Sequence, residues 1–178
     1  MTNSKVLILV DADVIIHLYK ADKISLLNDL YHSRVRIMDI VLSELLGNLT
    51  INKVVENLFI FKQLEEIKFP QSLYLEFNKI KDIVKGKGER ATLIYCKHNN
   101  DIIASSNTKD IVPYCKDNRM SYITTLDIFN IAIERKLMTT KEVNLCIGKI
   151  TMNDESYLCC KSIEDHRRNH FDSEKLLY

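Results

Sequence analysis

The chain has 178 residues, 25 basic and 24 acidic, and a formal net charge of +1 at pH 7. This length fits one domain with a sizeable core better than two domains. With a net charge this close to zero, the protein as a whole does not attract nucleic acids or anionic membranes electrostatically, so a polyanion would have to bind a local basic patch. No apolar run is long enough to span a bilayer, and the N-terminus leads directly into a strand, so we expect a cytoplasmic protein with no membrane partner.

The first element is an unbroken apolar run over 6–10, rich in Val and Ile. Such a run predicts a strand buried on both faces, as in the middle of a parallel sheet. Further short strands are expected at 35–38, 65–68, 102–105 and 121–124, separated by segments of helical periodicity. Strands that alternate with helices predict an α/β fold with a five-stranded, mostly parallel sheet and helices on both faces.

Helical segments are predicted between every pair of strands. One broken helix or two short ones follow the first strand, and the others are expected at 39–49, 51–61, 70–84, 89–96, from 110 onward, 126–135 and 141–150. The segment at 70–84 opens with Pro70, which a first helical turn tolerates.

Asp11 and Asp13 follow the first strand directly. In open α/β sheets, ligands bind beyond the carboxyl ends of the strands, so both acids would face that crevice. One acid there is often only the N-cap of the next helix. A second acid one residue away adds repulsion unless a cation neutralises the pair, which favours a functional site.

More acids come from later elements: Glu44 from a helix, Glu89 after Gly86-Lys87-Gly88, and Asp110 after the polar run Ser105-Ser106-Asn107. Mg²⁺ and Mn²⁺ take carboxylate and water oxygens, and acids from separate strand ends supply them. With no His or Cys at these positions, zinc fits less well. A bound divalent ion of this kind can promote hydrolysis of a phosphodiester.

These segments resemble the PIN-domain ribonucleases, which include toxins of bacterial toxin-antitoxin pairs. The resemblance is carried by 6–16, by Ile-Val-Leu-Ser-Glu-Leu at 40–45, by Gly-Lys-Gly-Glu-Arg-Ala at 86–91, and by 102–111. It implies a PIN-like domain over 1–150, Mg²⁺ or Mn²⁺ held by acids, RNA as substrate, and as partners an antitoxin protein and a second copy of the chain. By position, Asp11, Glu44 and Glu89 match the family's catalytic, metal-binding acids, and Asp13 falls where the family often has a polar residue.

The chain departs from the family pattern after the strand at 102–105. Family members usually have one or two Asp there, whereas this chain has Ser105, Ser106 and Asn107. We expect Asp110 to complete the catalytic and metal-binding acids, with Asn107 as an additional oxygen ligand and Ser106 orienting a water or a phosphate. The alternative for Asp110 is a purely local role at the helix N-terminus, where acids are favoured.

A basic run leads to Glu89, and its Lys85, Lys87 and Arg90 are predicted, together with Ser106 and Asp13, to contact the substrate. A solvated helix face is the alternative for this run. His17 is interpreted as a packed histidine. Asp127 is interpreted as an acid of a helix N-terminal turn, with an outer role at the site as the alternative.

The five cysteines fit reduced thiols better than a disulfide framework. The polar tail, 151–178, is expected to pack on the same domain as an extension. Its Cys159, Cys160, His166 and His170 resemble a metal set, but adjacent cysteines rarely chelate one ion without strain, so we expect the tail to be dispensable for metal binding.

Two other functions stay open. A catalytically inactive PIN-like domain that only binds RNA or a protein would explain the altered position after the fourth strand. The Asp-x-Asp after an apolar run also resembles haloacid-dehalogenase-type phosphatases, but Glu44 and Glu89 would then have no role, and the late acidic pair of that family is missing.

Overall fold

The computed structural model describes residues 6–47, 49–152 and 158–169. Its centre is a five-stranded sheet in the order β3-β2-β1-β4-β5, and every pair of neighbouring strands is parallel. The strands are β1 (Ile8–Val10), β2 (Val35–Met38), β3 (Glu65–Ile67), β4 (Ile102–Ala104) and β5 (Tyr122–Ile123). This confirms the predicted α/β fold, and each predicted strand overlaps an observed one. Because all strands run the same way, their carboxyl ends share one edge of the sheet.

Helices make every connection between strands. They are α1 (Ala12–Lys20), α2 (Leu26–Tyr31), α3 (Asp39–Leu45), α4 (Leu49–Ile60), α5 (Tyr74–Lys79), α6 (Lys87–Asn99), α7 (Thr108–Asp117), α8 (Thr125–Glu134), α9 (Thr140–Thr151) and α10 (Ile163–Asn169), with short 3₁₀ turns η1 (His32–Arg34) and η2 (Gln71–Leu73). The helix expected over 70–84 is shorter than predicted, because Pro70 is followed by η2 and α5 ends at Lys79.

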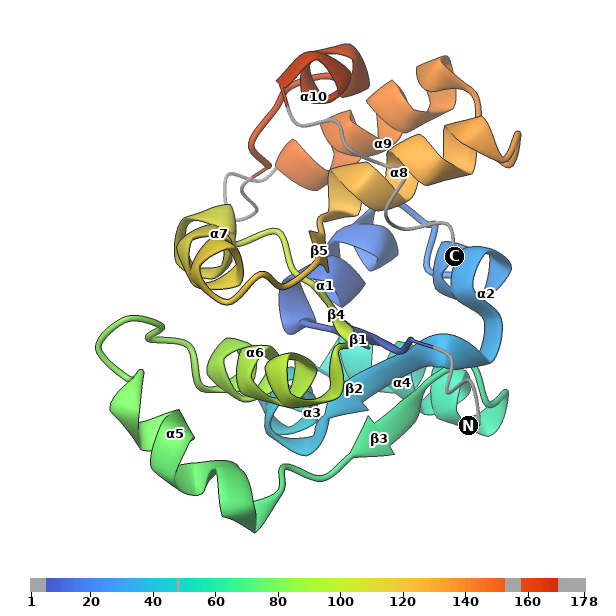
Figure 1. Ribbon diagram of the computed structural model, residues 1–178. Helices are drawn as coiled ribbons and strands as arrows, with labels where there is room; N and C mark the ends of the chain where they lie inside the picture. Colours follow the sequence, from blue (N-terminus) through green and yellow to red (C-terminus); the bar gives the residue numbers. More distant parts are fainter. Residues whose placement is uncertain (1–5, 48, 153–157, 170–178) are drawn as a thin grey trace.

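The sheet is buried between helices. All three residues of β1 are buried, as its unbroken apolar run predicts. Helix α6 packs on β1, β2 and β4, whereas α1 packs with α3, α4, α8 and α9. In Figure 1, α8, α9 and α10 lie above the sheet, and α5 and α6 lie to its left, at the level of β1 to β3. The edge of the sheet where Asp11 follows β1 is therefore framed by helices from both sides.

The C-terminal part of the described chain packs on the preceding helices. Helix α10 contacts α8 and α9. Asp127 lies in the first turn of α8 and forms a capping box with Thr124, as interpreted from the sequence. None of the helices within the described ranges combines the length and the apolar character needed to cross a membrane.

Candidate metal centre

Asp11 lies where β1 ends and α1 begins. It occupies the N-cap position of α1, but its side chain makes no capping hydrogen bond. Its backbone N–H instead donates to the carbonyl oxygen of Ala104 at 2.9 Å, which extends the pairing of β1 with β4. The residue is 8% exposed. The capping alternative therefore does not account for the Asp11 side chain, which is held at the sheet edge by the backbone.

Asp13 lies in the first turn of α1 and is bound by the loop after β4. Its Oδ2 accepts a hydrogen bond from the Ser106 N–H at 2.7 Å and one from the Ser105 hydroxyl at 3.4 Å. Its Oδ1 is buried and has no hydrogen-bond partner among the described residues. A buried carboxylate oxygen without a donor is costly. Asp13 therefore lies among the acids, held by the loop after β4, and its predicted contact with the substrate stays a prediction.

Glu89 lies in the first turn of α6 and is 4% exposed. Its Oε1 accepts from the Ser105 hydroxyl at 3.2 Å, and its Oε2 accepts from the Asn107 side-chain amide at 3.2 Å. The Ser105 hydroxyl oxygen thus contacts both Asp13 and Glu89. Ser105, which we did not single out as a site residue, is the link between the two carboxylates.

Asn107 and Asp110 complete a chain of polar contacts. The Asn107 amide nitrogen that binds Glu89 also lies 3.2 Å from Asp110 Oδ2. Asp110 is in the first turn of α7, as predicted, and Asn107 is the N-cap residue. The amide group of Asn107 therefore points its nitrogen at the two acids. To bind a cation through its carbonyl oxygen, as we predicted, the side chain must turn over.

Glu44 reaches the cluster from α3. Its Oε1 accepts a hydrogen bond of 3.1 Å from the backbone N–H of Gly88. A Cβ at Gly88 would lie 2.9 Å from Glu44 Oε2 and 2.8 Å from a methyl carbon of Val41. The glycine is required for this close approach. Unlike the other acids, Glu44 is exposed, so it lies at the rim of the cluster.

Burial and mutual repulsion make these carboxylates hard to ionise. Burial, followed by the charges of Asp13, Glu89 and Glu44, raises the pKa of Asp11 well above its ordinary value. Burial raises the pKa of Asp13 to about 6 and that of Glu89 to about 7. Neighbouring carboxylates add to the effect of burial at Asp11 and Glu89, whereas at Asp13 hydrogen bonds from Ser105, Ser106 and backbone N–H groups oppose it. A bound cation would lower the pKa of each of these acids.

The residues fit a hydrated hard cation better than a fully dehydrated one. Among the described residues, one group of three possible metal ligands has all its ligand atoms within 4.8 Å of one another, namely Cys159, Cys160 and His166. No three of the described acids lie that close together, so one ion could not contact them all directly. Mg²⁺ usually keeps several waters and uses one or two carboxylates directly. Asp11 and Asp13 are suited to contact the cation directly, since Oδ1 of Asp13 has no hydrogen-bond donor among the described residues. Glu44, Glu89 and Asp110 would bind the cation through water.

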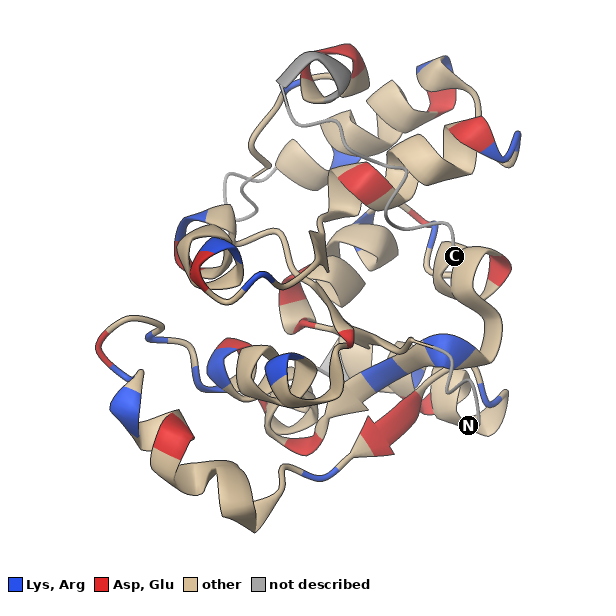
Figure 2. Ribbon diagram, in the orientation of Figure 1, with Lys and Arg blue, Asp and Glu red and all other residues tan. Residues whose placement is uncertain are grey.

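The predicted substrate-binding residues divide into exposed and buried ones. Lys85 and Lys87 are exposed. Figure 2 shows blue, basic positions along the connection from α5 to α6 and into the start of α6. Arg90 is only 6% exposed, and its guanidinium carbon lies 4.2 Å from the centroid of the Phe77 ring. The side chain packs against α5 instead of extending into solvent as Lys85 and Lys87 do, and its predicted contact with phosphate stays a prediction.

A polar network lies behind the cluster. The Ser106 hydroxyl donates to Thr125 Oγ1 at 2.9 Å and accepts from the Thr125 N–H at 3.1 Å. Nδ1 of His17 lies 3.0 Å from the same Thr125 oxygen. Burial lowers the pKa of His17 to about 4, so the ring is neutral near pH 7. The burial of His17 confirms it as a packed histidine. The two hydrogen bonds with Thr125 hold the Ser106 hydroxyl inside the fold, and its predicted role toward the substrate stays a prediction.

Comparison with protein-family models gave no match, and comparison with curated proteins gave no match either. The geometry described above is therefore the basis for assigning a function.

Proposed function

We propose that the chain is a PIN-like, Mg²⁺- or Mn²⁺-dependent endoribonuclease of the cytoplasm. The observation that carries this proposal is that three acids meet at one edge of a parallel sheet: Asp11 and Asp13, which follow β1, and Glu89 from α6. In addition, Asp13 Oδ1 is buried and lacks a donor among the described residues. Uncompensated buried carboxylates are expensive, and they are retained where a cation or chemistry needs them.

The residues have distinct roles in this proposal. Asp11 and Asp13 hold the cation, and Glu44, Glu89 and Asp110 bind its waters. A divalent cation there supplies a Lewis acid for the phosphate and lowers the pKa of a water. Burial raises the pKa of Glu89 to about 7 without a cation, and a bound cation would lower it and favour the carboxylate, which can accept a proton from a water. Ser105 and Asn107 orient Glu89 through hydrogen bonds at both carboxylate oxygens.

Single-stranded RNA is the substrate class that we propose. Lys85 and Lys87 are exposed at the start of α6, next to the turn that carries Glu89. Lysines beside a cation site can contact phosphates without reading sequence. The family resemblance adds an antitoxin protein and a second copy of the chain as partners. Co-purification with the product of the neighbouring gene tests the former, and sedimentation tests the latter.

A specific observation favours a second function, that of an inactive PIN-like domain binding RNA or a protein. Where the family pattern has acids after β4, Ser105, Ser106 and Asn107 donate hydrogen bonds to Asp13 and Glu89. These donors partly satisfy the carboxylates without a metal. The phosphatase alternative is weaker, because it leaves the contacts of Glu44 and Glu89 unexplained.

Isothermal titration of Mn²⁺ into the purified chain distinguishes the nuclease from the inactive domain. The nuclease proposal requires binding that Asp11→Asn weakens at least tenfold, together with cleavage of single-stranded RNA that EDTA abolishes. An inactive domain would retain RNA binding while showing neither effect.

A further inference from the structure

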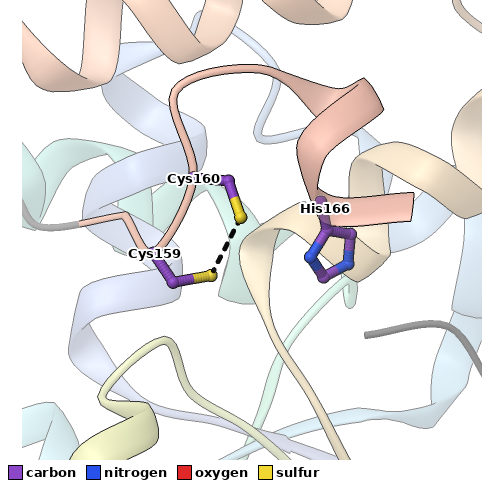
Figure 3. A group of neighbouring side chains, drawn as sticks. All are labelled: Cys159, Cys160 and His166. Atoms are coloured by element: carbon purple, nitrogen blue, oxygen red, sulfur yellow. Dashed lines mark hydrogen bonds between the residues drawn. The ribbon is translucent and has the colours of Figure 1, made fainter. Parts of the chain in front are cut away.

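The C-terminal segment brings two thiols and an imidazole together at the start of α8. Cys159 and Cys160 lie in the loop before α10, and His166 lies on α10. Their ligand atoms are all within 4.8 Å of one another. Figure 3 shows both sulfurs and the ring of His166 turned toward a common space. Cys160 and His166 are buried and Cys159 is half-buried, so this group is shielded from bulk water.

The separation of the sulfurs matches shared coordination. Sγ of Cys159 and Sγ of Cys160 are 3.8 Å apart. Two thiolates bound to a tetrahedral Zn²⁺, with Zn–S bonds of about 2.3 Å, lie about 3.8 Å apart. A disulfide requires about 2.05 Å between the sulfurs. The adjacent cysteines that we discounted from the sequence therefore hold their sulfurs at the spacing that one zinc ion needs.

The histidine is oriented as a zinc ligand usually is. Nε2 of His166 lies 2.7 Å from Oδ1 of Asp127. Metal-binding histidines commonly donate their second ring N–H to a carboxylate, which fixes the tautomer and the ring plane. Asp127 is itself fixed, because its Oδ2 accepts hydrogen bonds of 2.7 Å from both the N–H and the hydroxyl of Thr124. The capping box of α8 thus supports the histidine.

We propose that Cys159, Cys160 and His166 bind one Zn²⁺ ion, with Asp127 as the residue that positions His166. Thiolate and imidazole ligands select zinc over the hard cations that carboxylates prefer. The two thiol protons pass to solvent as the metal binds. Three ligands from the described residues would leave a fourth position on a tetrahedral ion. His170 lies outside the described residues.

A zinc ion at this position would fasten the loop of Cys159 and Cys160 to α10, and through His166 and Asp127 to the start of α8. Its ligands are separate from the acids at the carboxyl ends of β1 and β4. The proposal therefore does not depend on the nuclease function, and failure of one leaves the other standing.

Co²⁺ titration of the full chain tests the site, because tetrahedral cobalt bound to thiolate gives visible absorption and a sulfur-to-metal charge-transfer band. We expect the charge-transfer band to saturate at one equivalent of Co²⁺ and to disappear when Zn²⁺ displaces the cobalt. Cys159→Ser and Cys160→Ser should each weaken cobalt binding and lower the intensity of the charge-transfer band, and the double variant should abolish the band. Cys146→Ala, which removes another buried thiol on α9, should retain it, and so should Asp11→Asn.

Two further measurements keep the test decisive. Asp127→Asn should weaken cobalt binding about 10- to 100-fold while retaining the thiolate band. Circular dichroism verifies that the serine variants fold, and if they do not, His166→Gln and elemental analysis of the wild-type protein replace them. The proposal is overturned if the wild-type protein gives no thiolate band, if Cys159→Ser retains the band at full intensity, or if mass analysis finds the two cysteines joined as a disulfide with two hydrogens fewer.

Discussion

The backbone N–H of Ser106 donates a 2.7 Å hydrogen bond to Oδ2 of Asp13, although the two residues lie 93 positions apart in the chain. Through this bond the loop after β4 is fastened to the first turn of α1. The loop supplies donors to the acid where the resembled family supplies another acid. Such donors favour the charged carboxylate and add no negative charge to a cluster that already carries several acids.

The stability of the metal-free protein should depend on Glu89 in a defined pH range. Its pKa is raised by burial from 4.5 to about 7, so the folded state retains a proton that the unfolded state has lost between these values. Stability is therefore lost as pH rises through that range. The unfolding free energy of Glu89→Gln minus that of the wild type should therefore increase by on the order of 3 kcal/mol as pH rises from about 4.5 to 7.5.

Urea unfolding of both proteins in EDTA measures this difference. His17, whose pKa is lowered to about 4, has the opposite pH dependence, since its contribution is lost as pH falls below 6.5. That contribution is common to both proteins and cancels in the comparison. A difference between the two proteins that stays constant with pH would show that Glu89 ionises normally.

Two helical glycines provide a matched pair of substitutions. Gly88→Ala places a Cβ 2.9 Å from Glu44 Oε2 and 2.8 Å from Val41, so we expect a loss of about 1–3 kcal/mol and weaker Mn²⁺ binding. Gly148→Ala on α9 meets no atom within 4 Å and should instead stabilise by about 0.5–1 kcal/mol. Thermal unfolding and Mn²⁺ titration check both. Equal behaviour of the two variants would mean that Glu44 does not need its close approach to α6.

Asp110 and Asn107 can be separated by their effects on Mn²⁺ affinity. Asp110→Asn removes a charge from the cluster and should weaken binding severalfold. Asn107→Ala removes a donor shared by Glu89 and Asp110 but no charge, so its effect on affinity should be smaller. If Asp110→Asn binds Mn²⁺ like the wild type while Asn107→Ala loses binding, Asn107 is the ligand and Asp110 serves only the helix terminus.

Substitution of the exposed lysines should affect RNA binding, whereas substitution of the buried Arg90 should affect stability. Lys85→Ala with Lys87→Ala should lower the salt dependence of RNA binding, by about 0.7 in the logarithmic slope for each phosphate that is no longer neutralised, and leave stability unchanged. Arg90→Ala should destabilise the protein instead, because Arg90 packs on Phe77. Fluorescence anisotropy over a salt series and thermal unfolding measure the two effects. If Arg90→Ala changed the salt dependence of RNA binding and the lysine substitutions did not, Arg90 and not the lysines would be the phosphate contact.

The sequence predicted the sheet well because its signals are local. The buried run of β1 and the alternation with helices require no knowledge of distant contacts. Asp11 and Glu89 were identified for the same reason, since each follows a recognisable strand or glycine pair.

The parts that escaped prediction depend on side chains that meet across the fold. Arg90 lies next to Glu89 in the sequence, but the ring of Phe77 determines where its guanidinium packs. Ser105 stands where the resembled family usually has an acid, but residue type did not predict its partners, and only the tertiary structure brings its hydroxyl between Asp13 and Glu89. The sulfur geometry of Cys159 and Cys160 likewise depends on loop conformation, which residue type does not specify.

The most direct test of the nuclease proposal is the cleavage of a labelled single-stranded RNA by the purified chain with Mn²⁺, compared with Asp11→Asn prepared identically. Asp11 is the acid whose backbone is fixed to β4 and whose pKa burial and the neighbouring carboxylates raise, so its substitution should abolish turnover without unfolding the protein. We predict cleavage by the wild type that EDTA stops and excess Mn²⁺ restores, and none by a folded Asp11→Asn. Equal cleavage by the two proteins, or cleavage that persists in EDTA, would contradict the metal-dependent mechanism.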